Sequence, residues 1–296
     1  MPIKFHSAKW WSKESDGKVQ CHLCPRQCMI PQGSYGVCAV RYNHGGELVS
    51  FSYGYPVAIQ IDPIEKKPLR HFLPKTSTFS IGTLGCNLLC VFCQNHHLSR
   101  GAYQDRIVYR YFDPEQIAEL AERHGCESVS FTYNEPAVFG EYAMDVANAA
   151  HARGLKTILV SNAFITREAA AEIYPLMDAA NIDVKGFSEA YYKEMCGGSL
   201  KPVTDAVEFY KNEIGGHLEL TYLVIPGKND SDEMIDAYLD WVEQKLGIET
   251  PLHFTAYHPD YKYSGSPRTP LDLLHKIQHH AAKERRFPNI YLGNIC

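Results

Sequence analysis

Short apolar runs alternate with longer amphipathic stretches along most of the chain. From about residue 76 onward, apolar and β-branched residues form six strand-like runs, at 78–84, 128–133, 156–160, 180–184, 217–224 and 252–257. The stretches between these runs have helical spacing. Strands that alternate with helices in this way are typical of parallel βα units. The pattern therefore predicts an α/β fold, a partial (β/α)6-type barrel over residues 76–296.

Helix-capping residues support the predicted alternation of strands and helices. Asp113 and Pro114 provide an N-cap and a proline in the first turn, and Ile117 and Leu120 then fall on one face. Gly154 is suited to end the next helix. Further helices are expected at 141–153, 166–174, 188–195, 203–214, 232–246 and 270–285.

Residues 1–75 follow a different pattern. They are rich in Gly and Pro, contain only short β-like stretches and hold the first four cysteines. So small and broken a segment cannot bury much of a core, and a bound metal would stabilise it. We therefore expect a cysteine-rich metal-binding region at 1–75, followed by the barrel.

Composition and charge argue against several classes of protein, namely nucleic-acid-binding, membrane-spanning and secreted proteins. The 296 residues are 45% hydrophobic and 21% charged, and the formal net charge is −5. This mildly acidic chain has no long basic block, so we expect neither nucleic acid nor an anionic membrane as partner. No apolar run approaches the length of a membrane span, and no secretory signal is visible. We expect a cytoplasmic protein, in which cysteines bind metals more often than they form disulfides.

Three closely spaced cysteines follow the first strand of the predicted barrel. Cys86, Cys90 and Cys93 have the spacing Cys-x3-Cys-x2-Cys, with Phe92 before the third. Three thiolates of one loop are suited to one [4Fe–4S] cluster, with one iron left for a small molecule. The alternative is a structural zinc site, with His96 or His97 as fourth ligand.

Other polar residues are expected at the same end of the barrel. Catalytic groups of parallel βα-barrels lie at the carboxyl ends of strands. Asp183 and Lys185 alternate along their strand and should point to one side, either as functional groups or as an ordinary ion pair. The residues expected at the strand ends are Asn134, Glu135, Ser161, Asn162, Asp183, Lys185 and His258.

The first four cysteines form a second candidate metal site. Cys21, Cys24, Cys28 and Cys38 supply four thiolates, which suit either a tetrahedral zinc ion or an auxiliary iron–sulfur cluster. Their spacing does not separate the two.

The Cys86–Cys93 loop on a βα-barrel resembles the radical S-adenosylmethionine (SAM) superfamily. Phe131 to Pro136 resembles its Gly-Gly-Glu motif, and Val160 to Asn162 its Thr-Asn-Gly strand, except that Ala163 replaces the usual glycine. Over nearly its full length, the chain is similar to the radical SAM enzymes of the AmmeMemoRadiSam system, relatives of pyruvate formate-lyase activating enzymes. The similarity includes the first four cysteines and residues 291–294.

The resemblance implies an oxidoreductase-like enzyme with a [4Fe–4S] cluster on Cys86, Cys90 and Cys93. SAM would be cleaved there to methionine and a 5′-deoxyadenosyl radical. Glu135 and Asn134 would contact the SAM amino group, and Ser161 and Asn162 its ribose and carboxylate. Asp183 and Lys185 resemble the Asp-x-Lys of activating enzymes, and His258 would reach the adenine or the substrate. Implied partners are an electron donor such as flavodoxin or ferredoxin, and Memo-like and AMMECR-like proteins.

Three functions follow from these observations. The first is a radical SAM enzyme that abstracts hydrogen from a protein or small-molecule substrate. The second is an activating enzyme that installs a glycyl radical on a partner, although such enzymes place the three-cysteine loop closer to the N-terminus. The third is a non-catalytic zinc-binding barrel protein.

Overall fold

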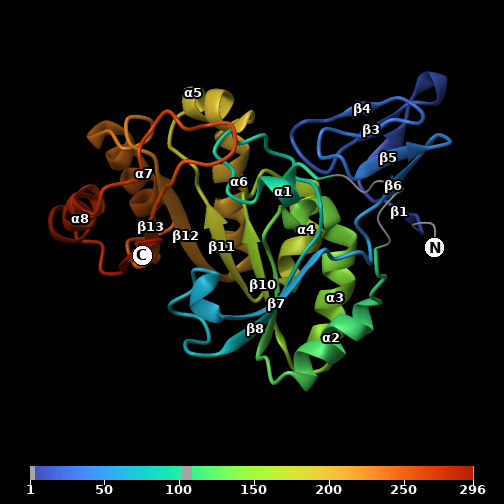
Figure 1. Cartoon of the computed structure of the whole chain (residues 1–296), viewed down its shortest axis with the longest axis horizontal. Coiled ribbons are helices and arrows are strands. Elements are labelled where there is room, and N and C mark those ends of the chain that lie inside the picture. Colours follow the sequence, from blue (N-terminus) through green and yellow to red (C-terminus); the bar gives the residue numbers. More distant parts are fainter. Residues whose placement is uncertain (1–3, 102–108, 296) are drawn as a thin grey trace.

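An eight-stranded sheet forms the centre of the computed structural model, which describes residues 4–101 and 109–295 (Figure 1). The strand order is β14-β13-β12-β11-β10-β9-β8-β7, and all neighbours are parallel except β7 and β8. The strands are β7 (Ala58–Pro63), β8 (Ser77–Gly82), β9 (Ser128–Phe131), β10 (Lys156–Ser161), β11 (Ala179–Asp183), β12 (His217–Val224), β13 (Leu252–Ala256) and β14 (Ile290–Gly293).

The α/β partial barrel predicted from the sequence is confirmed, and the six predicted strands are β8 to β13. Two further strands extend the sheet to eight. β14 follows the last helix and pairs with β13, whereas β7 pairs antiparallel with β8. Part of the segment expected to be irregular therefore lies in the large sheet.

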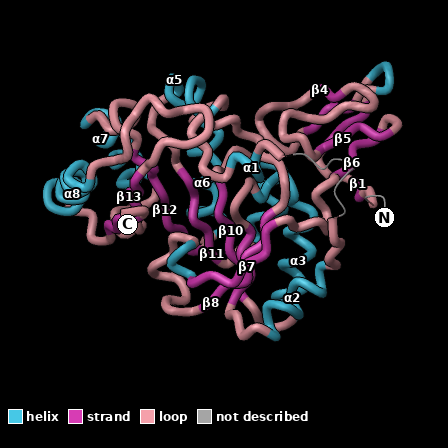
Figure 2. Tube along the Cα trace, viewed as in Figure 1, coloured by secondary structure: helices cyan, strands magenta, loops and turns pink. Residues whose placement is uncertain are grey.

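Helices connect the parallel strands, as the spacing predicted. Figure 2 shows α2 and α3 to one side of the strands and α7 and α8 to the other. The helices are α1 (His96–Ser99), α2 (Pro114–Arg123), α3 (Gly140–Ala152), α4 (Arg167–Ile173), α5 (Glu189–Tyr191), α6 (Lys201–Phe209), α7 (Asp232–Lys245) and α8 (Leu271–His279). α5, α6 and α8 each continue into one π-helical turn, at Tyr192–Cys196, Tyr210–Ile214 and His280–Glu284.

Local sequence explains where these helices begin. The Asp113 side chain accepts a hydrogen bond from the backbone of the first turn of α2, and the Gln116 side chain bonds back to the Asp113 backbone. The side chains of Thr166 and Ser231 likewise accept a hydrogen bond from the backbone of the first turn of α4 and α7. Each cap satisfies a backbone donor that the helix leaves unpaired, a contribution of about 1 kcal/mol.

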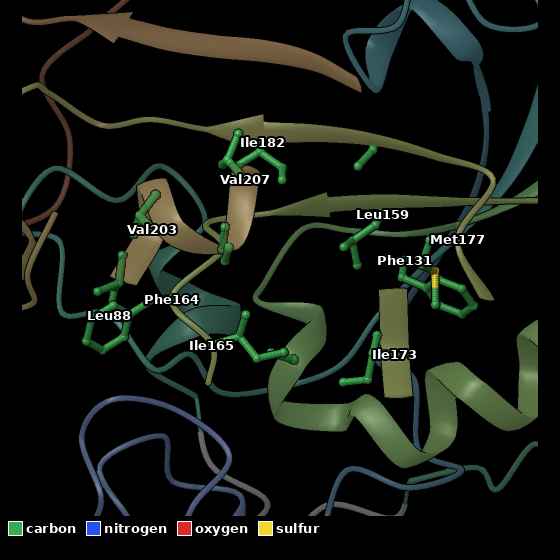
Figure 3. Close-up of a cluster of buried hydrophobic side chains, with 14 of the residues drawn as sticks. Leu88, Phe131, Leu159, Phe164, Ile165, Ile173, Met177, Ile182, Val203 and Val207 are labelled. Atoms are coloured by element: carbon green, nitrogen blue, oxygen red, sulfur yellow. The ribbon is translucent and has the colours of Figure 1, made fainter. Parts of the chain in front are cut away.

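The core lies between the sheet and its covering helices (Figure 3). Phe131, Leu159 and Ile182 come from the neighbouring strands β9, β10 and β11, and all three are buried. Val203 and Val207 are buried on α6. Burial of one such side chain contributes about 1.5–3 kcal/mol.

The N-terminal region forms two small sheets beside the barrel. One has the order β1 (His6–Ser7), β6 (Glu47–Ser50), β5 (Arg41–His44), and the other the order β2 (Trp11–Lys13), β3 (Val19–Cys21), β4 (Met29–Ile30). Arg41 forms a buried bidentate ion pair with Glu141 of α3, with N–O distances of 2.7 and 2.8 Å. Thr166, at the start of α4, donates to the carbonyl of His22. These contacts fix the small sheets against the barrel helices. Among the described residues, no helix is both long and apolar enough to cross a membrane.

Candidate active site

A cavity of about 370 Å³ lies at the carboxyl ends of the parallel strands. All of the residues predicted for the barrel site line it except His258. They are Cys86, Cys90, Cys93, Asn134, Glu135, Ser161, Asn162, Asp183 and Lys185. His258 is exposed, and its Nδ1 lies 2.8 Å from Nε2 of Gln94, which does line the cavity. The parallel topology thus brings together residues from four strand ends.

Asn134 holds the segment that leads into the three-cysteine loop. Its Oδ1 accepts a hydrogen bond of 3.0 Å from the backbone N–H of Thr83. Its Nδ2 lies 3.2 Å from the carbonyl oxygen of Leu84 and 2.8 Å from that of Gly85. The amide group is therefore occupied by the chain itself, and Asn134 positions the loop.

The rest of the three-cysteine loop is held by residues that were not identified from the sequence. Arg100 donates from Nη2 to the carbonyls of Cys86 and Leu88, at 2.9 and 2.6 Å. The backbone N–H of Leu89 donates to the carbonyl of Cys196 at 2.8 Å. Gly197, at a φ of 61°, permits this approach, because a Cβ there would lie 3.0 Å from Cβ of Leu89. Neither Arg100 nor Cys196 has a sequence spacing that identifies its role.

The three thiols lie in different electrostatic surroundings. Burial raises the pKa of Cys86 and Cys93, so both thiols are protonated until a metal displaces the proton. A hydrogen bond from the Cys196 thiol, and the nearby Lys185 charge, lower the pKa of Cys90 against the effect of burial. Cys196, interpreted from sequence as an isolated buried thiol, is therefore a neighbour of the loop.

Glu135 is buried and nearly saturated with hydrogen bonds. Its Oε1 accepts from the backbone N–H of Ala137 and from Oγ of Ser161, at 3.0 and 2.8 Å. Its Oε2 accepts from the backbone N–H of Asn162 at 2.8 Å. Burial raises the pKa of this carboxyl. A carboxylate oxygen accepts about two hydrogen bonds, so Oε2 retains one position for a donor in the cavity, and a cation there would favour the ionised form.

Asp183 and Lys185 form an ion pair at the end of β11, with an N–O distance of 2.5 Å. Both line the cavity, as their alternation predicted. Burial lowers the pKa of Lys185, but Asp183 and the neighbouring thiols outweigh it and the net shift is upward. Lys185 therefore presents a permanent positive charge beside the cysteine loop.

A second lysine at the cavity was not identified from the sequence. Lys67 is buried, and its Nζ lies 2.7 Å from Oδ2 of Asp62. The same oxygen accepts a hydrogen bond of 2.7 Å from the Tyr133 hydroxyl. Tyr133 has a φ of 73°, which a non-glycine residue adopts only under constraint. Lys67 lies between β7 and β8, in the part of residues 1–75 for which the sequence predicted no functional residue besides the cysteines.

The donor set suits a [4Fe–4S] cluster. Three thiols of one loop face one cavity, and three thiolates leave one iron of such a cluster without a protein ligand. His96, one of the two histidines suggested as a zinc ligand, stacks on Tyr261, with ring centroids 4.7 Å apart.

The first four cysteines also meet in space. Cys21, Cys24, Cys28 and Cys38 line a second, small cavity on the barrel side of the N-terminal sheets, together with Arg41 and Asn87. Cys28 is partly exposed and the other three are buried.

Comparison with known proteins agrees with this geometry. The family model of the radical SAM superfamily matches residues 80–239. The uncharacterized protein MJ0808 of Methanocaldococcus jannaschii is 38% identical over 97% of this chain and 85% of its own length. The 4-hydroxyphenylacetate decarboxylase activating enzyme of Clostridioides difficile is 22% identical over 64% of this chain and 66% of its own.

Solved structures share the fold at low identity. A radical SAM methyltransferase from Sphaerobacter thermophilus aligns with 97% of this chain and 76% of its own, with a TM-score of 0.56 and 11% identity. SuiB of Streptococcus suis aligns with 73% of this chain and 48% of its own, with a TM-score of 0.55 and 18% identity.

Proposed function

The chain belongs to the radical SAM superfamily, and we propose that Cys86, Cys90 and Cys93 hold the [4Fe–4S] cluster at which it cleaves SAM. The 5′-deoxyadenosyl radical then abstracts hydrogen from a protein or small-molecule substrate. The observation that carries this assignment is the single cavity shared by the three thiols and the buried Glu135.

A cluster held by Cys86, Cys90 and Cys93 would supply the low-potential electron for SAM cleavage. The chain positions and shields the reactants. Glu135 offers its remaining acceptor position to the SAM ammonium group, a charge-assisted hydrogen bond to a buried carboxylate. Ser161 and the Asn162 backbone orient that carboxylate. Asn134 and Arg100 keep the cysteine loop in place.

Two lysines add cationic groups to the lining of the cavity. Lys67 and Lys185 are each paired with an aspartate, so both are held at fixed positions. Thr221 and Thr255 add hydroxyl groups to the lining. This polar wall supports a substrate with hydrogen-bonding groups next to the hydrogen that is removed.

The test is SAM turnover. Anaerobically reconstituted, reduced enzyme should form 5′-deoxyadenosine and methionine, detected by liquid chromatography–mass spectrometry, even slowly without substrate. Cys86→Ala, Cys90→Ala and Cys93→Ala should each abolish the product, because each removes an iron ligand. Full turnover by the Cys90→Ala protein would refute the assignment.

Glycyl-radical activation is the second candidate function, because two activating enzymes are distant relatives of this chain. The reactions in their names are those of the relatives. For this chain, the similarity supports only the general class of glycyl-radical activation. The AmmeMemoRadiSam assignment, with Memo-like and AMMECR-like partners, likewise remains part of the proposal. A glycyl-radical doublet in the electron paramagnetic resonance (EPR) spectrum of a co-incubated partner would favour activation. Modification of a small molecule or of another residue would favour the first function.

We also propose a resident metal at Cys21, Cys24, Cys28 and Cys38, and an electron donor of the flavodoxin or ferredoxin class. The metal is proposed because these four cysteines line one small cavity. The electron donor is proposed because SAM cleavage consumes an electron.

A further inference from the structure

The segment between β7 and β8 forms the floor of the active-site cavity. β7 runs antiparallel to β8, so residues 64–76 between them lie at the amino end of β8, whereas the three-cysteine loop follows its carboxyl end. Asn181 of β11 donates to the carbonyl of Pro68 at 2.8 Å. Glu219 of β12 accepts from two backbone N–H groups of the same segment. Residues 66–68 line the cavity, and we call them its floor.

Lys67 presents hydrogen-bond donors from this floor that the chain itself does not use. The residue is only 2% exposed. Its ammonium group has three N–H donors, and in the described part of the chain the acceptor is Oδ2 of Asp62, at 2.7 Å. Buried donors without an acceptor are unfavourable. The remaining donors of Lys67 are therefore available to a molecule in the cavity.

Tyr133 holds this lysine in a fixed position. The Tyr133 hydroxyl donates to the same Oδ2 of Asp62 at 2.7 Å, and the Lys67 Nζ lies 4.7 Å from the centroid of the Tyr133 ring. Gly82 makes room for the ring, because a Cβ there would lie 2.9 Å from Cδ2 of Tyr133. The ammonium group is thus positioned both by a carboxylate and by an aromatic face.

The floor carries an excess of positive charge. Besides Lys67, Lys66 approaches Asp62, with its Nζ 3.5 Å from Oδ1. Two positive charges therefore share one negative charge, which leaves an excess of one positive charge. Such a site favours a ligand with a single negative charge. A carboxylate has this charge, whereas a phosphate monoester carries about −1.5 to −2 at pH 7.

The carboxylate of SAM does not fill this position. It is attached to the same carbon as the ammonium group that the proposed function assigns to Glu135. Burial lowers the pKa of Lys67, and the charges that act on it are those of Asp62 and Lys66. In contrast, the Lys185 charge acts on both Glu135 and Cys90. The SAM carboxylate therefore belongs to the Lys185 side of the cavity, and Lys67 faces another molecule.

We propose that Lys67 binds a carboxylate group of the substrate at the floor of the cavity, so that the substrate class is an organic acid. The proposal rests on the proposed function and adds the group by which the substrate is recognised. In this arrangement Asp62 and Tyr133 position the ammonium group, and the carboxylate accepts its remaining hydrogen bonds.

The first test uses acetate as the probe. With reconstituted, unreduced enzyme and saturating SAM, the methyl proton resonance of acetate should broaden in a saturable manner, whereas that of acetamide, its neutral analogue, should not. Lys67→Met should weaken acetate binding at least about tenfold, because it removes a charge-assisted hydrogen bond. Lys245→Met, at an exposed position at the end of α7, should match the parent. Absence of saturable acetate binding, equal binding by the Lys67→Met protein, or tighter binding of inorganic phosphate than of acetate would overturn the proposal.

The second test separates the substrate site from the SAM site. Calorimetry on the Lys67→Met protein should give a Kd for SAM within about threefold of the parent value. A loss of SAM affinity as large as the loss of acetate affinity would make Lys67 a ligand of SAM and would overturn the proposal. A parent that binds acetate through Lys67 but does not cleave SAM would refute the proposed function and leave the carboxylate site intact.

A paired variant covers the case in which the single variant does not fold. Lys67→Met leaves Asp62 without its nearest cation, and circular dichroism reports whether the protein is still folded. If it is not, Lys67→Met/Asp62→Asn removes both charges together and retains an oxygen that accepts from the Tyr133 hydroxyl. The double variant should also lose acetate affinity at least about tenfold. Acetate affinity equal to that of the parent would overturn the proposal.

Discussion

The backbone N–H of Asn162 donates a hydrogen bond of 2.8 Å to Oε2 of Glu135, and so joins the carboxyl ends of β9 and β10. This contact and the two bonds to Oε1 leave Glu135 one free acceptor position, in a buried site that favours a cationic ligand.

Glu135→Gln should therefore weaken SAM binding without removing the cluster. Loss of a hydrogen bond to a charged group costs about 1.5–3 kcal/mol, equivalent to roughly 10- to 150-fold in Kd. Calorimetry on reconstituted protein measures the affinity, and the visible absorption spectrum reports the cluster. The matched change Glu168→Gln, at an exposed position on α4, should have no effect. Unchanged affinity in the Glu135→Gln protein would mean that the carboxylate serves only to join the strand ends.

Asn134→Ala should act through the cysteine loop rather than through SAM. The Asn134 amide is bound to residues 83–85, so its loss frees the segment that positions Cys86. We expect lower iron content after reconstitution, measured chemically, with Asn212→Ala as an exposed control. Full iron content combined with weak SAM binding would instead assign Asn134 to the direct SAM contact that the sequence motif implied.

Cys196 should adjust the reduction potential of the cluster. Its thiol lies beside Cys90, and hydrogen bonds to cluster sulfurs help to set the potential. Cys196→Ala removes the donor and should move the midpoint potential to more negative values, whereas Cys196→Ser retains a donor and should stay near the parent. A redox titration followed by EPR measures the shift. If the Ala and Ser variants had the same potential, Cys196 would be a packing residue only.

Glu219 should stabilise the opposite end of the barrel. It is fully buried on β12 and accepts hydrogen bonds from the His253 ring at 2.6 Å and from the backbone N–H groups of Arg70 and His71. Glu219→Gln leaves these donors partly unpaired and should lower the free energy of unfolding by about 3 kcal/mol in urea denaturation.

The same carboxylate gives a pH signature. Burial raises the pKa of Glu219, but the hydrogen bonds from His217, His253 and the backbone outweigh it and lower the pKa from 4.5 to about 2. Its stabilising effect is therefore complete above about pH 4.5 and is lost as the pH falls toward 2. The difference in unfolding free energy between the parent and Glu219→Gln should be constant from pH 7 to 5 and shrink below 4.5. A constant difference down to pH 3 would contradict this account. Because both proteins would lose an acid-labile cluster alike, the difference isolates Glu219.

Local patterns in the sequence were sufficient to predict the strands and helices of the central barrel. The six strands and the cap at Asp113 depend on interactions within a few residues, so they are visible without a structure. The Cys86–Cys93 spacing and the strand-end position of Glu135 are equally local. Topology then places them together, because the carboxyl ends of parallel strands meet at one edge of the sheet.

Contacts between distant segments were decided only by the tertiary structure. The role of Cys196 depends on a turn that packs against the loop more than 100 residues earlier. The ion pair of Lys67 depends on β7, whose place in the sheet is set by pairing with β8. Likewise, Cys38 reaches Gly85 because the Arg41–Glu141 pair fixes the small sheets to the barrel. Sequence spacing carries no information about such approaches, since they arise from the packing of whole elements.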